Sequence, residues 1–114
     1  LLALAFDYRV MRQDRGYFCL PSVDIGIAFS PGMSALINAK LPQPIAHDLV
    51  VSGRQIGGGE AQSIGAVSVA TDVDSVLDEA MEMATAFGAK DRDTLRLVKR
   101  RLYPDAASML TTEV

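Results

Sequence analysis

Histidine and cysteine are almost missing from this sequence of 114 residues, which contains one of each. The single Cys19 cannot form an internal disulfide bond, and its apolar neighbours predict a buried core thiol. An unpaired cysteine is typical of a reducing compartment such as the cytoplasm. His47 has no second histidine or cysteine at ligand spacing, so the sequence predicts no metal site and a surface or capping role for this histidine.

A surplus of basic residues is also missing, because the net charge is −3 and the isoelectric point is near 5.0. Nucleic-acid-binding proteins usually carry a basic surplus, so we expect no nucleic-acid partner. No apolar run approaches the roughly 20 residues of a membrane-spanning helix, so we expect no membrane partner. With 49% hydrophobic and 22% charged residues, the composition is that of one small globular domain.

Residues 1–7 contain neither methionine nor the charged region and cleavage pattern of a signal peptide. They are mostly apolar and predict the end of a buried helix, which would need packing partners from earlier in a chain. We therefore expect this chain to be the C-terminal part of a longer protein or a shortened homologue. Its localisation stays open beyond a reducing compartment.

Short strands and amphipathic helices are predicted along the rest of the chain. Strands are expected at 8–11, at 17–20 with both faces buried, and after a turn at 65–70. Ser30 and Pro31 predict a helix start, as N-cap and first helical residue. Helices are expected at 31–41, 45–52, 73–88 and 93–103, with a poorly specified tail after Pro104. The residues expected to face inward include Met33, Leu36, Ile37, Leu41, Ile45, Leu49, Val73, Leu77, Ala80, Met81, Ala84, Phe87, Leu95, Val98 and Leu102.

Two features of the sequence suggest phosphate binding. Residues Gly57 to Gly59 lack the Lys-Ser or Lys-Thr of a P-loop and the preceding strand of a dinucleotide site, so they predict a flexible turn before a one-turn helix. The second feature is a basic cluster between residues 90 and 101. It is either a solvated outer face or an anion site, because arginine forks match phosphate oxygens. The cluster consists of Lys90, Arg92, Arg96, Lys99, Arg100 and Arg101.

Three phrases resemble the crotonase superfamily of enoyl-CoA hydratases and isomerases. ALAFDYRVM at 3–11 is similar to the helix and strand after that family's glycine-rich oxyanion turn. LPSVDIGI at 20–27 is similar to its Pro-Glu stretch, and VSGRQIGGGEAQSIGAV at 51–67 to its T-G-x-x-x-x-A-x-x-A-x-x-x-G-L-V phrase. Residues 7–21 and 30–41 look closer to the Δ3,Δ2-enoyl-CoA isomerase branch.

The resemblance implies an α/β fold, a spiral of strand-strand-helix repeats followed by C-terminal helices. Residues 1–70 would form the C-terminal part of the spiral core, and residues 71–114 a helical region that assembles a homo-trimer or hexamer. The implied activity is double-bond isomerisation of fatty acyl-CoA thioesters during β-oxidation. Two backbone N–H groups would hold the enolate, and both would precede Leu1. No separate cofactor is implied, because coenzyme A is part of the substrate.

The resemblance also assigns the site residues. The family's catalytic glutamate follows a proline, and that position is Ser22, whose hydroxyl needs another base to activate it. In an extended segment Asp24 would point to the same side as Ser22, so it is the candidate substitute; the alternative is an aspartate that hydrogen-bonds to the loop backbone. The substrate-binding residues implied are Leu20, Pro21, Val23, Phe29 and Ser30, and those at the CoA phosphates are Lys90, Arg96, Lys99 and Arg100.

Two functions therefore remain open. The first is an acyl-CoA isomerase, with a hydratase as the weaker version, because a hydratase would have a glutamate where Leu1 stands. The second is a non-catalytic crotonase-fold module that binds acyl-CoA or mediates assembly. The loop around Ser22 favours the first function, and the serine itself favours the second.

Overall fold

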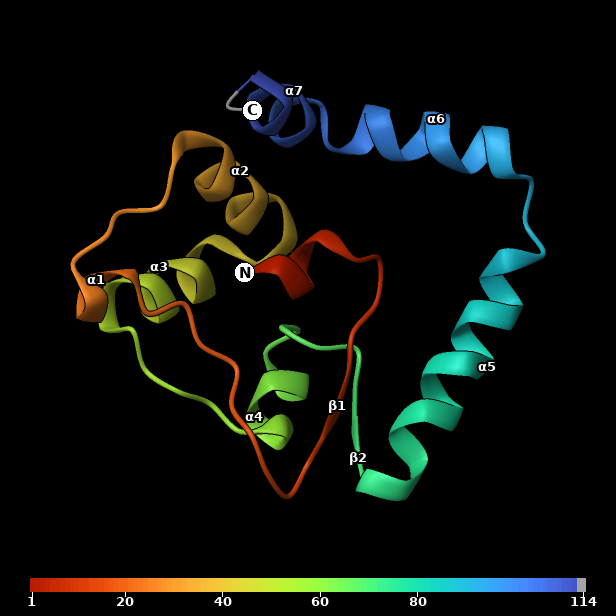
Figure 1. Ribbon diagram of the computed structural model, residues 1–114, viewed down its shortest axis with the longest axis horizontal. Helices are drawn as coiled ribbons and strands as arrows, with labels where there is room; N and C mark the ends of the chain where they lie inside the picture. The colour runs from red at the N-terminus through yellow and green to blue at the C-terminus, as the bar shows by residue number, and fades with distance from the viewer. Residues whose placement is uncertain (113–114) are drawn as a thin grey trace.

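A two-stranded parallel sheet connects distant parts of the chain in the computed structural model, which describes residues 1–112 (Figure 1). Strand β1, Val10–Arg12, pairs with β2, Val69–Thr71, in the register Val10 to Val69 and Arg12 to Thr71. Parallel strands need a crossover connection. Residues 13–68 provide it and contain helices α1 to α4.

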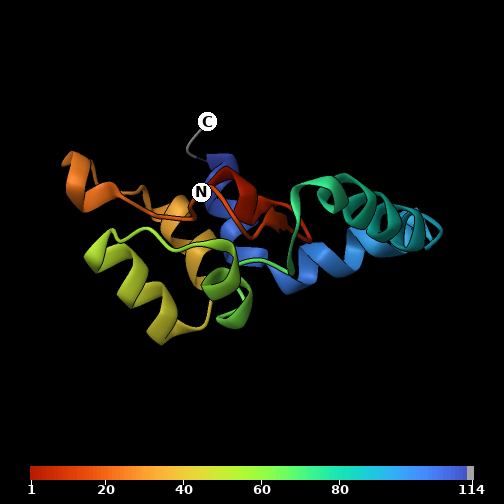
Figure 2. The ribbon, with the colours of Figure 1, turned by 90° about the horizontal axis from the view of Figure 1, so that it is seen from below.

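The remaining elements are helical, and α5 and α6 project away from the other elements in both views (Figures 1 and 2). We call these two helices the arm. After the arm, α7 returns to pack against α2. The bounds are η1 Leu2–Ala5, α1 Ser22–Ile25, α2 Pro31–Lys40, α3 Gln43–Ser52, α4 Gly58–Ser63, η2 Val73–Ser75, α5 Val76–Gly88, α6 Arg92–Leu102 and α7 Pro104–Thr112.

The hydrophobic core lies where η1, α2, α3 and α4 meet the segment around Leu20. Four side chains in it are fully buried, and each contributes roughly 1.5–3 kcal/mol by leaving water. They are Leu4, Leu20, Leu49 and Ile56. All of the buried core residues except Ala106 of α7 therefore precede the arm in the sequence.

The predicted start of α2 and end of α3 are confirmed at their caps, whereas α3 begins at Gln43, two residues earlier than predicted. The Ser30 hydroxyl oxygen accepts a hydrogen bond from the Met33 N–H at 3.2 Å, and Pro31 is the first helical residue. Gly53 ends α3 with φ of 65°, a left-handed conformation that favours glycine. The inward positions Leu36 and Ile37 are buried as predicted, whereas Met33 is 39% exposed.

The strand predicted at 17–20 is wrong. Only Phe18 pairs, in a single antiparallel bridge with Ile56, and Tyr17 is 68% exposed. Phe18 and Leu20 are buried and Cys19 is half-buried, so burial alternates and the thiol is not a core group. The apolar run had indicated burial on both faces, but no second strand pairs with this segment among residues 1–112.

The first residues also differ from the prediction of a buried helix. Residues Leu2–Ala5 form one 3-10 turn in which Leu4 alone is buried and Leu2 is 77% exposed. Strand β1 starts at Val10, two residues later than predicted, and directly follows Arg9. The Arg9 side chain donates to the carbonyl oxygens of Ala66 at 2.7 Å and Phe6 at 3.0 Å. This half-buried guanidinium fastens the start of β1 to the turn before β2, and burial lowers its pKa.

The arm has the predicted helices but not the predicted burial. No residue of α5 or α6 is buried, and Leu77, Met81 and Leu102 are 69%, 57% and 64% exposed. Leu95 and Val98 are exposed as well, so the inward assignment is wrong within this chain. Asp72 caps the turn η2 by accepting from the Ser75 N–H. The rings of Tyr8 and Phe87 stack 4.6 Å apart and attach the end of α5 to the core segment.

The tail is better ordered than the sequence indicated. Pro104 starts α7 as its first helical residue, a position that proline favours because no N–H is needed there. Ala106 is buried where α7 meets α2. The last two residues of the predicted region 71–114 lie outside the described residues, and its boundary at residue 70 stays a prediction. Among residues 1–112, no helix is both long and apolar enough to cross a membrane.

Gly58, the middle residue of the glycine triplet, is helical and not part of a flexible turn. Gly58 is the first residue of α4 and lies close in space to the last residue of β1. A Cβ placed on Gly58 would lie 2.5 Å from the carbonyl oxygen of Arg12. A Cβ on Gly59 would meet nothing within 4 Å. The glycine at 58 thus permits a helix and a strand to approach closely.

This contrast generates a stability prediction. Gly58→Ala should lower the free energy of unfolding by about 1–3 kcal/mol, because the methyl group overpacks a rigid backbone contact. Gly59→Ala is the matched control and should raise stability by about 0.5–1 kcal/mol through helix propensity. Urea unfolding of the two variants measures both changes. Equal effects would contradict a close contact at Gly58.

Candidate functional site

Ser22, at the position of the expected acid–base residue, is buried in the first turn of α1. Ser22 is 6% exposed and directly follows Pro21, and Leu20 before the proline is fully buried. The turn ends at Gly26, whose φ is 70° and whose N–H donates to the Ser22 carbonyl oxygen. The serine therefore faces the protein interior, and its role in catalysis stays a prediction.

Asp24 does not share the side of Ser22, because the segment is helical and not extended. Positions two apart in a helix lie about 200° apart around its axis. Asp24 is exposed, and its carboxylate lies against the end of α3, where a Cβ on Gly53 would be 2.5 Å from Oδ2. The geometry expected for a substitute base beside Ser22 is thus wrong, and α1 is joined to α3 instead.

The other residues expected to contact the substrate do not line one common surface. Val23 is 55% exposed, whereas Phe29 lines a cavity of about 210 Å³ between α2 and α3. The Ser30 side chain accepts a hydrogen bond as the N-cap of α2. Leu20 is a core residue and Pro21 is half-buried. Their role as substrate contacts stays a prediction.

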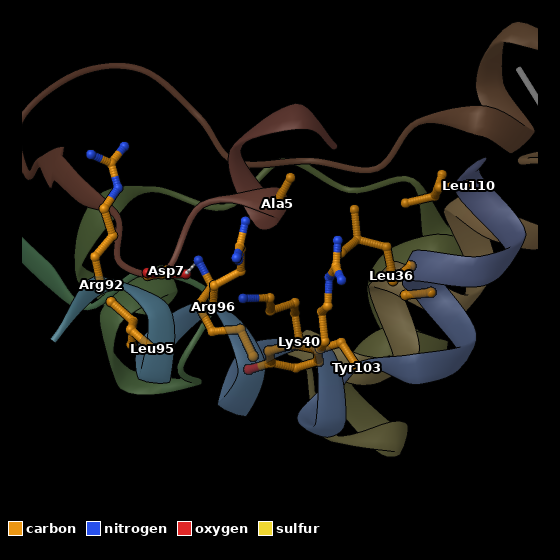
Figure 3. Close-up of a pocket in the computed structure, with 13 residues that line it drawn as sticks. Ala5, Asp7, Leu36, Lys40, Arg92, Leu95, Arg96, Tyr103 and Leu110 are labelled. Atoms are coloured by element: carbon orange, nitrogen blue, oxygen red, sulfur yellow. Dashed lines mark ion pairs between the residues drawn. The ribbon is translucent and has the colours of Figure 1, made fainter.

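Four of the five basic residues of α6 face a cavity of about 470 Å³ between η1, α2, α6 and α7 (Figure 3). Arg96, Lys99 and Arg100, three of the four residues expected at CoA phosphates, line it. Lys90 and Arg101 do not line it. We call it the cationic pocket; its lining consists of Ala5, Asp7, Leu36, Lys40, Arg92, Leu95, Arg96, Lys99, Arg100, Tyr103, Ala106, Ala107 and Leu110.

Sequence reasoning missed Lys40 at the end of α2, Asp7 after η1, and Tyr103 between α6 and α7. The Lys40 Nζ lies 4.5 Å from the centre of the Tyr103 ring and donates to the Phe6 carbonyl oxygen at 3.4 Å. Such a cation–π contact is favourable even when partly exposed. No spacing in the sequence indicates it, because the fold alone brings α2 and the start of α7 together.

Most of the wall of the cationic pocket is apolar, but its charged residues are mostly basic although the chain is acidic overall. Five of its lining residues are basic and one, Asp7, is acidic. Arg92, Arg96 and Arg100 are spaced by four residues, which places them along one face of α6. The Asp7 Oδ1 lies 2.7 Å from the Lys99 Nζ, and Arg96 lies 3.7 Å from Asp93. This arrangement suits an anion with several charged oxygens.

The remaining candidates carry little chemistry. His47 is exposed on α3, as predicted for a surface histidine. Within residues 1–112, no three histidine, cysteine or acidic side chains are grouped to hold a metal ion.

Comparisons with known proteins agree in one family. The family model described as enoyl-CoA hydratase/isomerase matches residues 1–114. "Enoyl-CoA delta isomerase 3" of Arabidopsis thaliana is 31% identical over 96% of this chain and 48% of its own length. "Enoyl-CoA delta isomerase 2, peroxisomal" of the same plant is 32% identical over 99% of this chain and 49% of its own length. The chain therefore spans about half the length of these curated relatives.

A solved structure confirms the fold. The enoyl-CoA hydratase ECHA3 from Mycobacterium marinum superimposes with a TM-score of 0.86 over 97% of this chain and 49% of that one. At 18% identity this likeness concerns the fold alone. The crotonase fold predicted from the sequence is confirmed, and so is the resemblance to the isomerase and hydratase family.

The N-cap of α6 generates a pH prediction. The Asp91 carboxylate accepts hydrogen bonds from the Thr94 N–H and hydroxyl, and these lower the pKa of Asp91. A depressed carboxyl pKa stabilises the fold above the ordinary value of about 4, and this contribution disappears as the pH falls through the folded-state pKa. The Thr94 amide resonance should therefore shift below about pH 4. Asp91→Asn keeps a capping oxygen without the charge, and an identical titration in that variant would refute the assignment.

Proposed function

Because the chain belongs to the enoyl-CoA hydratase/isomerase family, we propose that it is the C-terminal part of a protein that binds fatty acyl-CoA thioesters and isomerises their double bond. The cationic pocket is the observation that carries this proposal, since it gathers Arg96, Lys99 and Arg100 beside Lys40. Two relatives named delta isomerase support isomerisation over hydration. A place in fatty acid β-oxidation is part of the same proposal.

The phosphate groups of coenzyme A would bind in the cationic pocket. Guanidinium groups hold phosphate oxygens through two parallel hydrogen bonds, and lysine adds a point charge. Arg92 and Lys40 line the pocket, so we add them to the phosphate-binding set; Lys90 lies outside it, so we remove it. The Lys40 side chain, held over Tyr103, would present its charge in a fixed direction.

Isomerisation requires a base that removes a proton from the α carbon and returns it at the γ carbon, while the thioester oxygen carries the enolate charge. A buried serine lacks a suitable pKa, and the carboxylate of Asp24 lies at the end of α3. We therefore propose that the natural residue at position 22 supplies no efficient base, and that the oxyanion-hole N–H groups belong to a part of the protein outside these residues.

A non-catalytic module that binds acyl-CoA is the second candidate. It is favoured by one observation, the burial of Ser22 where the resemblance implies a glutamate. Such a module would still use the cationic pocket, so ligand binding does not separate the two candidates. Only turnover does.

The homo-trimer or hexamer stays a prediction. Its support is the arm, which exposes large apolar side chains on both of its helices, including Leu77, Met81 and Leu102. Apolar surface of this kind is typical of an interface between subunits.

The first functional prediction concerns Ser22. In the full-length protein, Ser22→Glu should raise the rate of 3-enoyl-CoA isomerisation by roughly 10²-fold or more, because a carboxylate at the family's position can move the proton. Ser22→Gln is the matched control, since it has the same shape without the charge. A spectrophotometric isomerase assay measures all three proteins.

The alternatives make different predictions in that assay. If the natural protein turns over and Ser22→Glu is no faster, the base lies elsewhere. Asp24→Asn then abolishes turnover only if Asp24 is that base. If the natural protein binds acyl-CoA without any turnover, the second candidate is correct.

The second prediction concerns the cationic pocket. Arg100→Ala should weaken coenzyme A binding about tenfold at low salt, because a charge-assisted hydrogen bond is lost. Binding by the natural protein should weaken as salt rises, and the variant should show a flatter dependence. Arg101→Ala changes the same charge on the same helix outside the pocket and should have little effect. Calorimetric titration at two salt concentrations tests this, and equal losses in both variants would refute it.

A further inference from the structure

One lysine of the cationic pocket already has an anionic partner. The Lys99 Nζ lies 2.7 Å from the Asp7 Oδ1, the pair drawn as a dashed line in Figure 3. Asp7 follows η1 and Lys99 belongs to α6, so the pair bridges the pocket from the core to the arm. Among the described residues that line the pocket, Asp7 is the one carboxylate.

This ion pair is exposed enough to exchange its partner. The side chains of Lys99 and Asp7 are 42% and 41% exposed. Ion pairs at this exposure add little to stability, because water and salt screen them. A phosphate group entering the pocket offers Lys99 more negative charge and more acceptor oxygens than one carboxylate.

We propose that Asp7 is an internal competitor for Lys99 that lowers the affinity of the cationic pocket for phosphate groups. This inference rests on the proposed function of that pocket. A phosphate-bearing ligand separates Lys99 from Asp7 when it binds, and the carboxylate recovers the lysine when the ligand leaves. Asp7 therefore sets how tightly the pocket holds its ligand.

The alternative role for Asp7 is to position Lys99 and the arm. Other contacts already hold the arm. Lys40 joins the Tyr103 ring to the Phe6 carbonyl oxygen, and Tyr8 stacks on Phe87 of α5. Removal of the Asp7 charge therefore leaves the arm attached while it frees Lys99. The two roles predict opposite signs, since a competitor weakens anion binding and a positioning residue strengthens it.

The experiment compares Asp7→Asn with the natural full-length protein in calorimetric titrations with free coenzyme A and with inorganic pyrophosphate at low salt. Asp7→Asn should tighten binding of both about fivefold, the effect of one unit charge removed at close range in water. Asp14→Asn is the matched control, because Asp14 pairs with Arg12 at 2.8 Å and neither residue lines the pocket. It should change affinity less than twofold.

Two further measurements keep the outcomes distinct. In a Lys99→Gln background, Asp7→Asn should have less than a twofold effect, because no lysine remains to be freed. Asp7→Ser repeats the test with a second uncharged side chain. If the natural protein binds coenzyme A and both Asp7 variants bind it equally or more weakly, the competitor is refuted while the proposed pocket function stands. If neither the natural protein nor the variants bind coenzyme A or pyrophosphate, both are refuted.

Discussion

The parallel pairing of β1 with β2 is the constraint on which the positions of the other elements depend. Because the strands run in the same direction, the chain between them must travel back along the sheet, and residues 13–68 do so through four helices. This crossover contains Ser22, the cap of α2 and most of the core. Gly58 then permits α4 to approach the end of β1 closely. The loop that contains Ser22 and the sheet are thus parts of one packing unit.

The sequence predicted what depends on local chemistry. Ser30 with Pro31, and Gly53 with its left-handed backbone, mark helix ends whose hydrogen bonds lie within a few residues. The sequence also predicted the family, because the three motif phrases occur in the family's order. It failed at residues 17–20, since an apolar run indicates burial but does not say whether a partner strand exists.

The candidate site was predictable only in part for a similar reason. Arg96, Lys99 and Arg100 were identifiable as a cluster on one helix, but Lys40 and Asp7 reach the same cavity from other elements. Asp24 was misplaced because four residues of helix replaced an expected extended segment, and a change of periodicity reverses the side on which a carboxylate lies. Electrostatic environments depend on long-range contacts that no spacing along the chain reveals.

The return of α7 to α2 has a consequence for how the arm tolerates change. Between η2 and α7 the chain leaves the core, adds no buried residue over α5 and α6, and comes back at Ala106. In polymer terms the arm is a closed loop that is anchored at its ends and, between them, by the Tyr8–Phe87 stack and the Lys99–Asp7 ion pair. The entropy cost of closing such a loop grows only with the logarithm of its length, by about 0.6 kcal/mol for each doubling. Insertions at the connection between α5 and α6, which leave both contacts in place, should therefore cost this chain little stability. Selection on the arm's length would then come from what its exposed faces and its cations contact.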